Sequence, residues 1–128
     1  MVASVLGMTG CVTPPTPDEM AKIDYGSYPS DYENIINRYL RQVLKDPDSA
    51  KVEFLNRPTA QFHKKGPLFG GGINAGYGVC AYVNAKNSYG GYTGAKLHWF
   101  LIKNGRVTDD SNGMQMMAQN ACRSINAY

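Results

Sequence analysis

Residues 77–103 read YGVCAYVNAKNSYGGYTGAKLHWFLIK, and this stretch predicts the centre of a β-sheet. Its two ends, 77–85 and 95–103, alternate apolar side chains with the period of two that is typical of β-strands. The stretch between them, 83–94, is rich in polar residues and glycine, which favour turns. The pattern therefore predicts an antiparallel hairpin, in which Val79 and Cys80 point to opposite faces.

The residues upstream of this hairpin predict an amphipathic helix over 31–45. Apolar residues recur there at the spacing of one helix face: Tyr32, Ile35, Ile36, Tyr39, Leu40, Val43 and Leu44. Ser30 and Glu33 have the spacing of a capping box, and Pro47 is expected to end the helix. The chain before the hairpin thus supplies a helix that covers a core.

Shorter segments are expected to complete the sheet. They are a strand over 51–56, a weaker strand over 59–65, a glycine-rich connection over 66–76, and a short return strand over 106–108. Asn104-Gly105 predicts a type I′ turn, because both residues tolerate positive φ angles. The sequence places these strands in one antiparallel sheet of about four strands.

A second helix is expected at the carboxyl end of the chain. One face of it carries Met114, Met117, Ala118, Ala121, Cys122 and Ile125. Ser111 or Asn112 is expected to cap it. The predicted fold class is α+β: an antiparallel sheet of about four strands packed against an N-terminal and a C-terminal helix. A partly closed barrel with a flanking helix is the alternative.

The amino terminus, MVASVLGMTGC, resembles the end of a bacterial lipoprotein signal peptide, in which small residues precede a cysteine that is lipidated. The resemblance implies a signal-peptide remnant over 1–10, a lipid (palmitate-type acyl chains) on Cys11 and a flexible tether over 11–24. A single α+β domain over 25–128 follows. Val12, in place of aspartate, implies the outer membrane. A disordered leader with a chance cysteine is the alternative.

Three cysteines occur in the 128 residues. If Cys11 carries a lipid, Cys80 and Cys122 remain as a pair, and an even remainder in an exported protein favours a disulfide. The helical period turns Cys122 toward the core, where Cys80 could meet it. Two buried free thiols in a cytosolic protein are the alternative.

The sequence offers little support for catalysis, cofactors or nucleic acid. The glycine runs match neither G-x-G-x-x-G nor G-x-x-x-x-G-K-[ST]. Only two histidines occur, His63 and His98, and neither has a partner at metal-ligand spacing. Cys80 as a nucleophile with His98 as its base would need a third group to orient the histidine, and the sequence nominates none. The net charge of +3 comes from scattered cations, so no stripe would neutralise a phosphate backbone.

A pair of aspartates and a cluster of methionines each have two interpretations. Asp109 and Asp110 would face opposite ways in a strand, so they are interpreted as a turn or a helix start rather than as paired catalytic carboxylates. Met114, Met116 and Met117 fit a soft metal site or an adaptable binding face. Two of these methionines fall on the apolar helix face, which favours core packing.

The stretch 83–94 remains as the candidate binding loop. Asn84, Lys86, Asn87, Tyr89 and Tyr92 lie between glycines there, and tyrosine with asparagine suits glycan or peptide contacts. The alternative is a long hairpin connection in which these residues serve the turn. No cofactor or metal is expected in either case.

Two motifs, DPDSA at 46–50 and VNAKNSYGGYTG at 83–94, resemble those of small, uncharacterised bacterial envelope lipoproteins with DPxSA and VNAKNSxGGYTG. The resemblance covers about residues 28–107 and implies a compartment and a shared loop, but no activity. We expect a non-enzymatic outer-membrane lipoprotein facing the periplasm, with peptidoglycan or an envelope protein complex as partner. A lysozyme inhibitor, a structural subunit of a secretion apparatus and a small envelope hydrolase are the alternatives.

Overall fold

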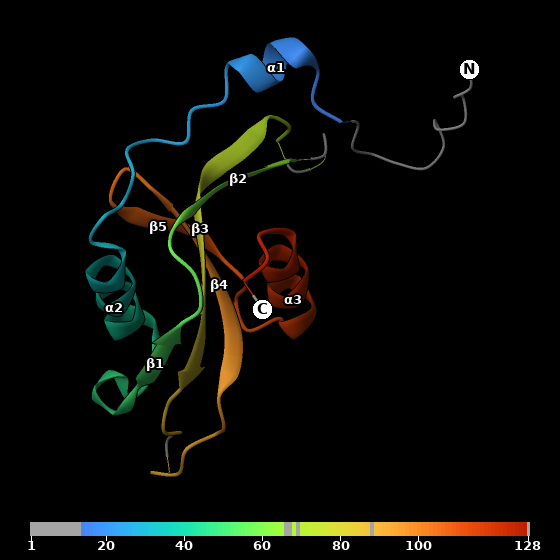
Figure 1. The fold of residues 1–128 in the computed structure, drawn as a ribbon. Helices are drawn as coiled ribbons and strands as arrows, with labels where there is room; N and C mark the ends of the chain where they lie inside the picture. The colour runs from blue at the N-terminus through green and yellow to red at the C-terminus, as the bar shows by residue number, and fades with distance from the viewer. Residues whose placement is uncertain (1–13, 66–67, 69, 88, 128) are drawn as a thin grey trace.

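The computed structural model describes residues 14–65, 68, 70–87 and 89–127. Cys11 and the segment 1–10, which resembles a signal peptide, lie outside these residues. The fold is α+β, as predicted: an open antiparallel sheet carries one helix near each end of the domain (Figure 1). The elements are α1 (Pro17–Ala21), α2 (Tyr32–Val43), β1 (Lys51–Phe54), β2 (Thr59–Lys64), β3 (Ile73–Asn84), β4 (Lys96–Lys103), β5 (Arg106–Asp110) and α3 (Gln115–Ser124).

Strand β3 is the centre of the five-stranded sheet. It pairs with β4 on one side, and β4 pairs with β5 through the turn at Asn104 and Gly105. Both turn residues have positive φ, as the type I′ prediction requires. On its other side β3 pairs first with β2 and then, further along, with β1. The edge of the sheet therefore consists of two short strands in line.

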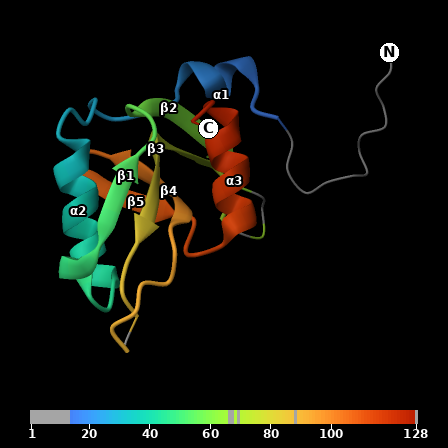
Figure 2. The same ribbon diagram turned by 60° about the horizontal axis from the view of Figure 1, so that its bottom comes forward.

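Helices α2 and α3 cover opposite faces of the sheet, which gives three layers (Figures 1 and 2). The period of two in β3 and β4 explains this arrangement, because each strand buries both of its faces. The core beneath α2 contains Ile35, Ile36, Leu40, Val79, Ala81, Val83, Phe100 and Ile102. The core beneath α3 contains Cys80, Leu97, Trp99, Leu101, Ala118 and Cys122.

Asn56 fills the break between β1 and β2. Its side-chain oxygen accepts a hydrogen bond from the Cys80 amide at 2.7 Å, and its amide nitrogen donates to the Gly78 carbonyl at 3.1 Å. These two bonds replace the backbone hydrogen bonds that a neighbouring strand would otherwise make with β3. Asn56 thus lets the edge change strands without leaving backbone groups of β3 unsatisfied.

Replacing Asn56 with alanine should lower the free energy of unfolding by about 2–3 kcal/mol, because a buried N–H and C=O lose their partners. Chemical denaturation of the two proteins measures the difference. The control is Asn37→Ala on the exposed face of α2, which we expect to change stability by less than about 0.5 kcal/mol. Equal effects of the two substitutions would show that Asn56 does not hold the edge together.

Several boundaries differ from the sequence predictions. Helix α2 begins after Asp31 without a side-chain cap, so the capping box predicted for Ser30 and Glu33 is wrong. A capping box forms instead between Thr16 and Glu19, and it stabilises a helix over Pro17–Ala21 where an extended tether was expected. Glu19 also pairs with Lys64 of β2 at 3.2 Å, which fastens this helix to the domain.

Two segments predicted as connections are part of the sheet. The glycine-rich connection ends earlier than predicted, because β3 begins at Ile73. Asp109 and Asp110 end β5 rather than starting a helix, and they do face opposite ways: Asn74 donates to Asp109 at 3.0 Å, while the Tyr39 hydroxyl donates to Asp110. Helix α3 starts after Met114 without a side-chain cap, so the caps predicted at Ser111 and Asn112 are also wrong.

Candidate functional site

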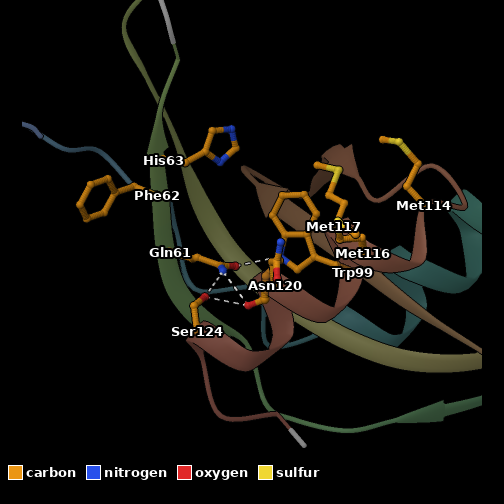
Figure 3. Close-up of a pocket in the computed structure, with 10 residues that line it drawn as sticks. Gln61, Phe62, His63, Trp99, Met114, Met116, Met117, Asn120 and Ser124 are labelled. Carbon is orange, nitrogen blue, oxygen red and sulfur yellow. Dashed lines mark hydrogen bonds between the residues drawn. The ribbon is translucent and has the colours of Figure 1, made fainter. Parts of the chain in front are cut away.

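A pocket of about 590 Å³ opens between β2 and α3. Gln61 and His63 come to it from β2, Trp99 from β4, and Met117 and Asn120 from α3 (Figure 3). Helix α3 packs mainly over β4 and β3, so the α3 face of β2 is only partly covered beside it. The pocket is this uncovered area of the sheet, with α3 as its wall.

The floor of the pocket is a hydrogen-bonded pair, Trp99 and Gln61. The indole Nε1 of Trp99 donates to Gln61 Oε1 at 2.8 Å, and Gln61 Nε2 donates to the Ala121 carbonyl at 3.1 Å and to Ser124 Oγ at 3.0 Å. One amide therefore ties β2, β4 and α3 together, and the polar atoms of the floor satisfy one another. The surface left to a ligand is mostly apolar.

Gly78 of β3 makes room for this floor. A Cβ on Gly78 would lie 2.0 Å from Gln61 Oε1 and 3.3 Å from Trp99 Nε1. Every other side chain would displace the bond between Gln61 and Trp99. The absence of a side chain in the middle of a central strand is thus what allows the tryptophan to form the bottom of a cavity.

Methionines form the outer part of the pocket. Met114 is 54% exposed and Met116 is 75% exposed, while Met117 is half-buried and lies against the Trp99 indole (Figure 3). Core packing was predicted for two of the three, and this is wrong for Met114, because α3 begins after it and leaves it at the mouth. Methionine has a flexible thioether chain, which suits an adaptable apolar binding surface.

The predicted binding loop is the connection between β3 and β4 (Figures 1 and 2). Lys86 and Tyr92 face each other in a β-bridge. Asn87 stabilises the tip, since its side-chain oxygen accepts from the amides of Tyr89 at 2.9 Å and Gly91 at 3.2 Å. Asn84 accepts from the Gly94 amide at 3.1 Å. Both asparagines thus serve the turn.

The two tyrosines of the loop differ in their surroundings. The Tyr92 hydroxyl donates to the Ser49 carbonyl at 3.2 Å, and the ammonium groups of Lys51 and Lys86 lie 4.5 and 5.5 Å from its ring centre. Tyr92 therefore fastens the loop to the segment before β1. The Tyr89 side chain projects outward and is 95% exposed. Of the five predicted residues, Tyr89 is the one most available to a partner.

Cys80 and Cys122 meet in the core beneath α3, as their predicted pairing requires. Their sulfur atoms are 1.98 Å apart, at disulfide distance, and both residues are fully buried. The bond joins β3 to α3 and so supports the wall of the pocket from behind. It also places Cys80 with Cys122 rather than in a nucleophilic pair with His98.

His98 lies on the α2 face, where its ring stacks on Phe100 with 5.9 Å between the ring centres. Burial lowers the pKa of His98 below its ordinary value, against a smaller opposite effect of Asp110. Nearby, burial and the bond to Asp110 raise the pKa of Tyr39 to about 12. The rings of both residues contact Phe100, so they belong to the packed α2 face of the sheet.

Stability should fall as the pH drops below about 6.5, the ordinary pKa of histidine. Because the folded protein holds the pKa of His98 lower, the unfolded chain takes up the proton more readily. The stabilisation is complete above the unfolded pKa and is lost as the pH falls through the folded pKa. Melting temperatures between pH 7.5 and 5 should decline less in His98→Gln. Identical slopes would show that His98 makes no such contribution.

Within the described ranges, no group of three or more His, Cys, Asp or Glu side chains is placed to hold a metal ion. None of the helices there has the length and apolar character that crossing a bilayer demands. Comparisons of the chain with protein-family models, curated proteins and solved structures found no match. The function is therefore inferred from the geometry of this chain.

Proposed function

We propose that the protein is a non-enzymatic binding module of the bacterial envelope, which captures an extended, apolar segment of an envelope protein. In this proposal a lipid on Cys11 anchors it in the outer membrane, and the domain faces the periplasm. The observation that carries the proposal is the apolar pocket beside the edge strand β2. An apolar pocket favours a protein segment over peptidoglycan, which presents hydroxyl and amide groups.

The position of strand β2 at the edge of the sheet is the reason for proposing an extended partner segment. The strand pairs with β3 on one side, and the described residues give it no strand on the other. An extended peptide can add to such an edge through main-chain hydrogen bonds, with every second side chain on the same face. On β2 that face carries Gln61 and His63, which line the pocket. A partner strand beside β2 would therefore bring alternate side chains toward Trp99 and the methionines.

The loop offers a second contact. Tyr89 is exposed beside Asn87, whose side-chain oxygen accepts a hydrogen bond from the Tyr89 amide. This bond restricts the backbone in advance, so binding through the Tyr89 ring would cost little conformational entropy. This ring could stack on a sugar or pack on a protein, which keeps peptidoglycan as a candidate partner for this end of the domain. The residues that line the pocket come from β2, β4 and α3 and include none of the loop residues 84–92, so the two are separate contacts.

Photo-crosslinking in cells tests the main proposal. A photoreactive residue at Met116, on the mouth of the pocket, should capture a protein, and the captured site should lie in an extended apolar segment. The control position is Val43, which is exposed on α2 at the opposite face and should capture nothing comparable. Equal capture from both positions, or capture of a folded polar surface, would contradict the proposal. Position 89 reports separately on the loop.

The intact mass of the protein, expressed in a Gram-negative host from its native gene, tests the anchor. We expect cleavage before Cys11, added acyl chains and two hydrogens fewer than the reduced chain. An unprocessed and fully reduced chain would remove the envelope from the proposal. The pocket and its partner would then have to be sought in another compartment.

Changing Asn87 and Tyr89 together to alanine should leave the free energy of unfolding within about 1 kcal/mol of the wild type, because both are exposed and far from the core. It should also weaken partner capture at the loop end. Thermal unfolding and capture from position 92 measure the two effects. Unfolding of the variant, or unchanged capture, would show that the loop serves only as scaffold.

A further inference from the structure

A second, polar cavity of about 340 Å³ lies on the α2 face, between α2 and the turn that joins β4 to β5. Arg38 and Gln42 stand four residues apart on α2 and therefore share one side of the helix. Arg106 follows the turn at Asn104 and Gly105 and approaches from the sheet. Ile35 and Val107 add apolar surface between these polar groups.

The two arginines have no acidic partner in the described part of the chain. There, carboxylates lie within 4.0 Å of Arg41 and Lys64, but of neither Arg38 nor Arg106. The Tyr39 hydroxyl at the same cavity already donates to Asp110. Two guanidinium groups that share a concave surface repel each other, and an anion between them would relieve this repulsion.

We propose that this cavity is a binding site for a phosphate group. Three residues with side-chain donor groups line it from two elements: Arg38 and Gln42 from α2 and Arg106 from β5. The oxygens of a phosphate group are arranged tetrahedrally, so they can accept from donors on two different elements, whereas both oxygens of a carboxylate lie in one plane. Arginine forms paired hydrogen bonds with phosphate oxygens, and the apolar contacts of Ile35 and Val107 reduce the screening of these bonds by water.

The phosphate could belong to a lipid headgroup or to a soluble compound, and the cavity would recognise the same group in both. The site lies on the α2 face, whereas the apolar pocket lies on the α3 face. A ligand at one would therefore leave the other open. The inference does not depend on the partner proposed for the pocket.

The test is a titration of the full chain with inorganic phosphate at low ionic strength, followed by the arginine side-chain signals in NMR spectra. Arg38→Gln and Arg106→Gln should each weaken binding at least tenfold. Arg123→Gln is the matched control, because it removes the same charge from α3, and it should bind as the wild type does. Equal weakening in all three variants, or none, would overturn the proposal.

Vesicles identify the source of the phosphate. A lipid headgroup would be assigned if vesicles of phosphatidylglycerol bind the wild type but neither cavity variant. Added inorganic phosphate should then release the wild type from the vesicles. Phosphate binding that depends on both arginines, without such vesicle binding, would assign a soluble phosphate compound. Vesicle binding that survives both substitutions, together with absent phosphate binding, would overturn the site.

Discussion

Replacing Cys122 with serine should lower the free energy of unfolding by about 4 kcal/mol, the value that a chain-entropy model gives for a loop of this length. The two cysteines are 42 residues apart, and both are fully buried. Loss of the bond frees the unfolded chain and leaves a hydroxyl against the core beneath α3. The expected result is a large fall in the denaturation midpoint.

The double variant Cys80→Ser/Cys122→Ser separates the bond from the buried hydroxyls. Both variants lose the same bond, so the second serine should add only the cost of one more buried hydroxyl, about 1–3 kcal/mol. Reducing agent should destabilise the wild type but neither variant. A melting temperature that changes neither with Cys122→Ser nor with reducing agent would show that the bond does not form in the protein.

Replacing Trp99 with alanine should lower the free energy of unfolding by about 4 kcal/mol, because a large buried side chain leaves a cavity that the core cannot fill. Trp99 is only 2% exposed and lies in the core beneath α3. The substitution also removes the donor to Gln61, which ties β2 to the rest of the domain. Denaturant titration followed by circular dichroism measures the loss.

Trp99→Phe is the matched variant, since it keeps most of the apolar ring and removes the indole N–H. We expect a loss of about 1–2 kcal/mol, mostly from the unsatisfied oxygen of Gln61. Hydrogen exchange in β2 should accelerate in this variant more than in β4. If Trp99→Phe lowered the free energy of unfolding as much as Trp99→Ala does, the predicted difference between losing one hydrogen bond and losing the whole ring would be contradicted.

The parts of the fold that follow from local patterns were predictable. The alternation in 77–103 identified β3 and β4 and their opposite faces, and the Asn104-Gly105 turn identified the start of β5. The apolar stripe of α2 identified Ile35, Ile36 and Leu40, which are buried, but it wrongly included Val43, which is 53% exposed because it lies in the last turn of the helix. These features depend on side chains two, three or four residues apart, and such distances are visible in a sequence.

The parts that depend on contacts between distant residues were missed. Asn56 is the last residue of the strand predicted over 51–56, but β1 ends at Phe54, and only the pairing of β3 with two strands shows that Asn56 completes the edge. The pocket depends on Gly78, Gln61 and Trp99, which are brought together by the register of three strands. Three methionines within 114–117 were a signal for this site, but the sequence could not tell an exposed helix start from a buried face.

The most direct test of the binding proposal is calorimetry with a synthetic peptide that carries the segment crosslinked from position 116. Asn120 lies on the exposed side of the pocket, so Asn120→Phe should fill the cavity without disturbing the core. Asn34→Phe places the same ring on the exposed face of α2 as a control. We predict that Asn34→Phe binds as the wild type does and that Asn120→Phe binds at least tenfold more weakly. Equal affinities for all three proteins would contradict the assignment of the pocket as the binding site.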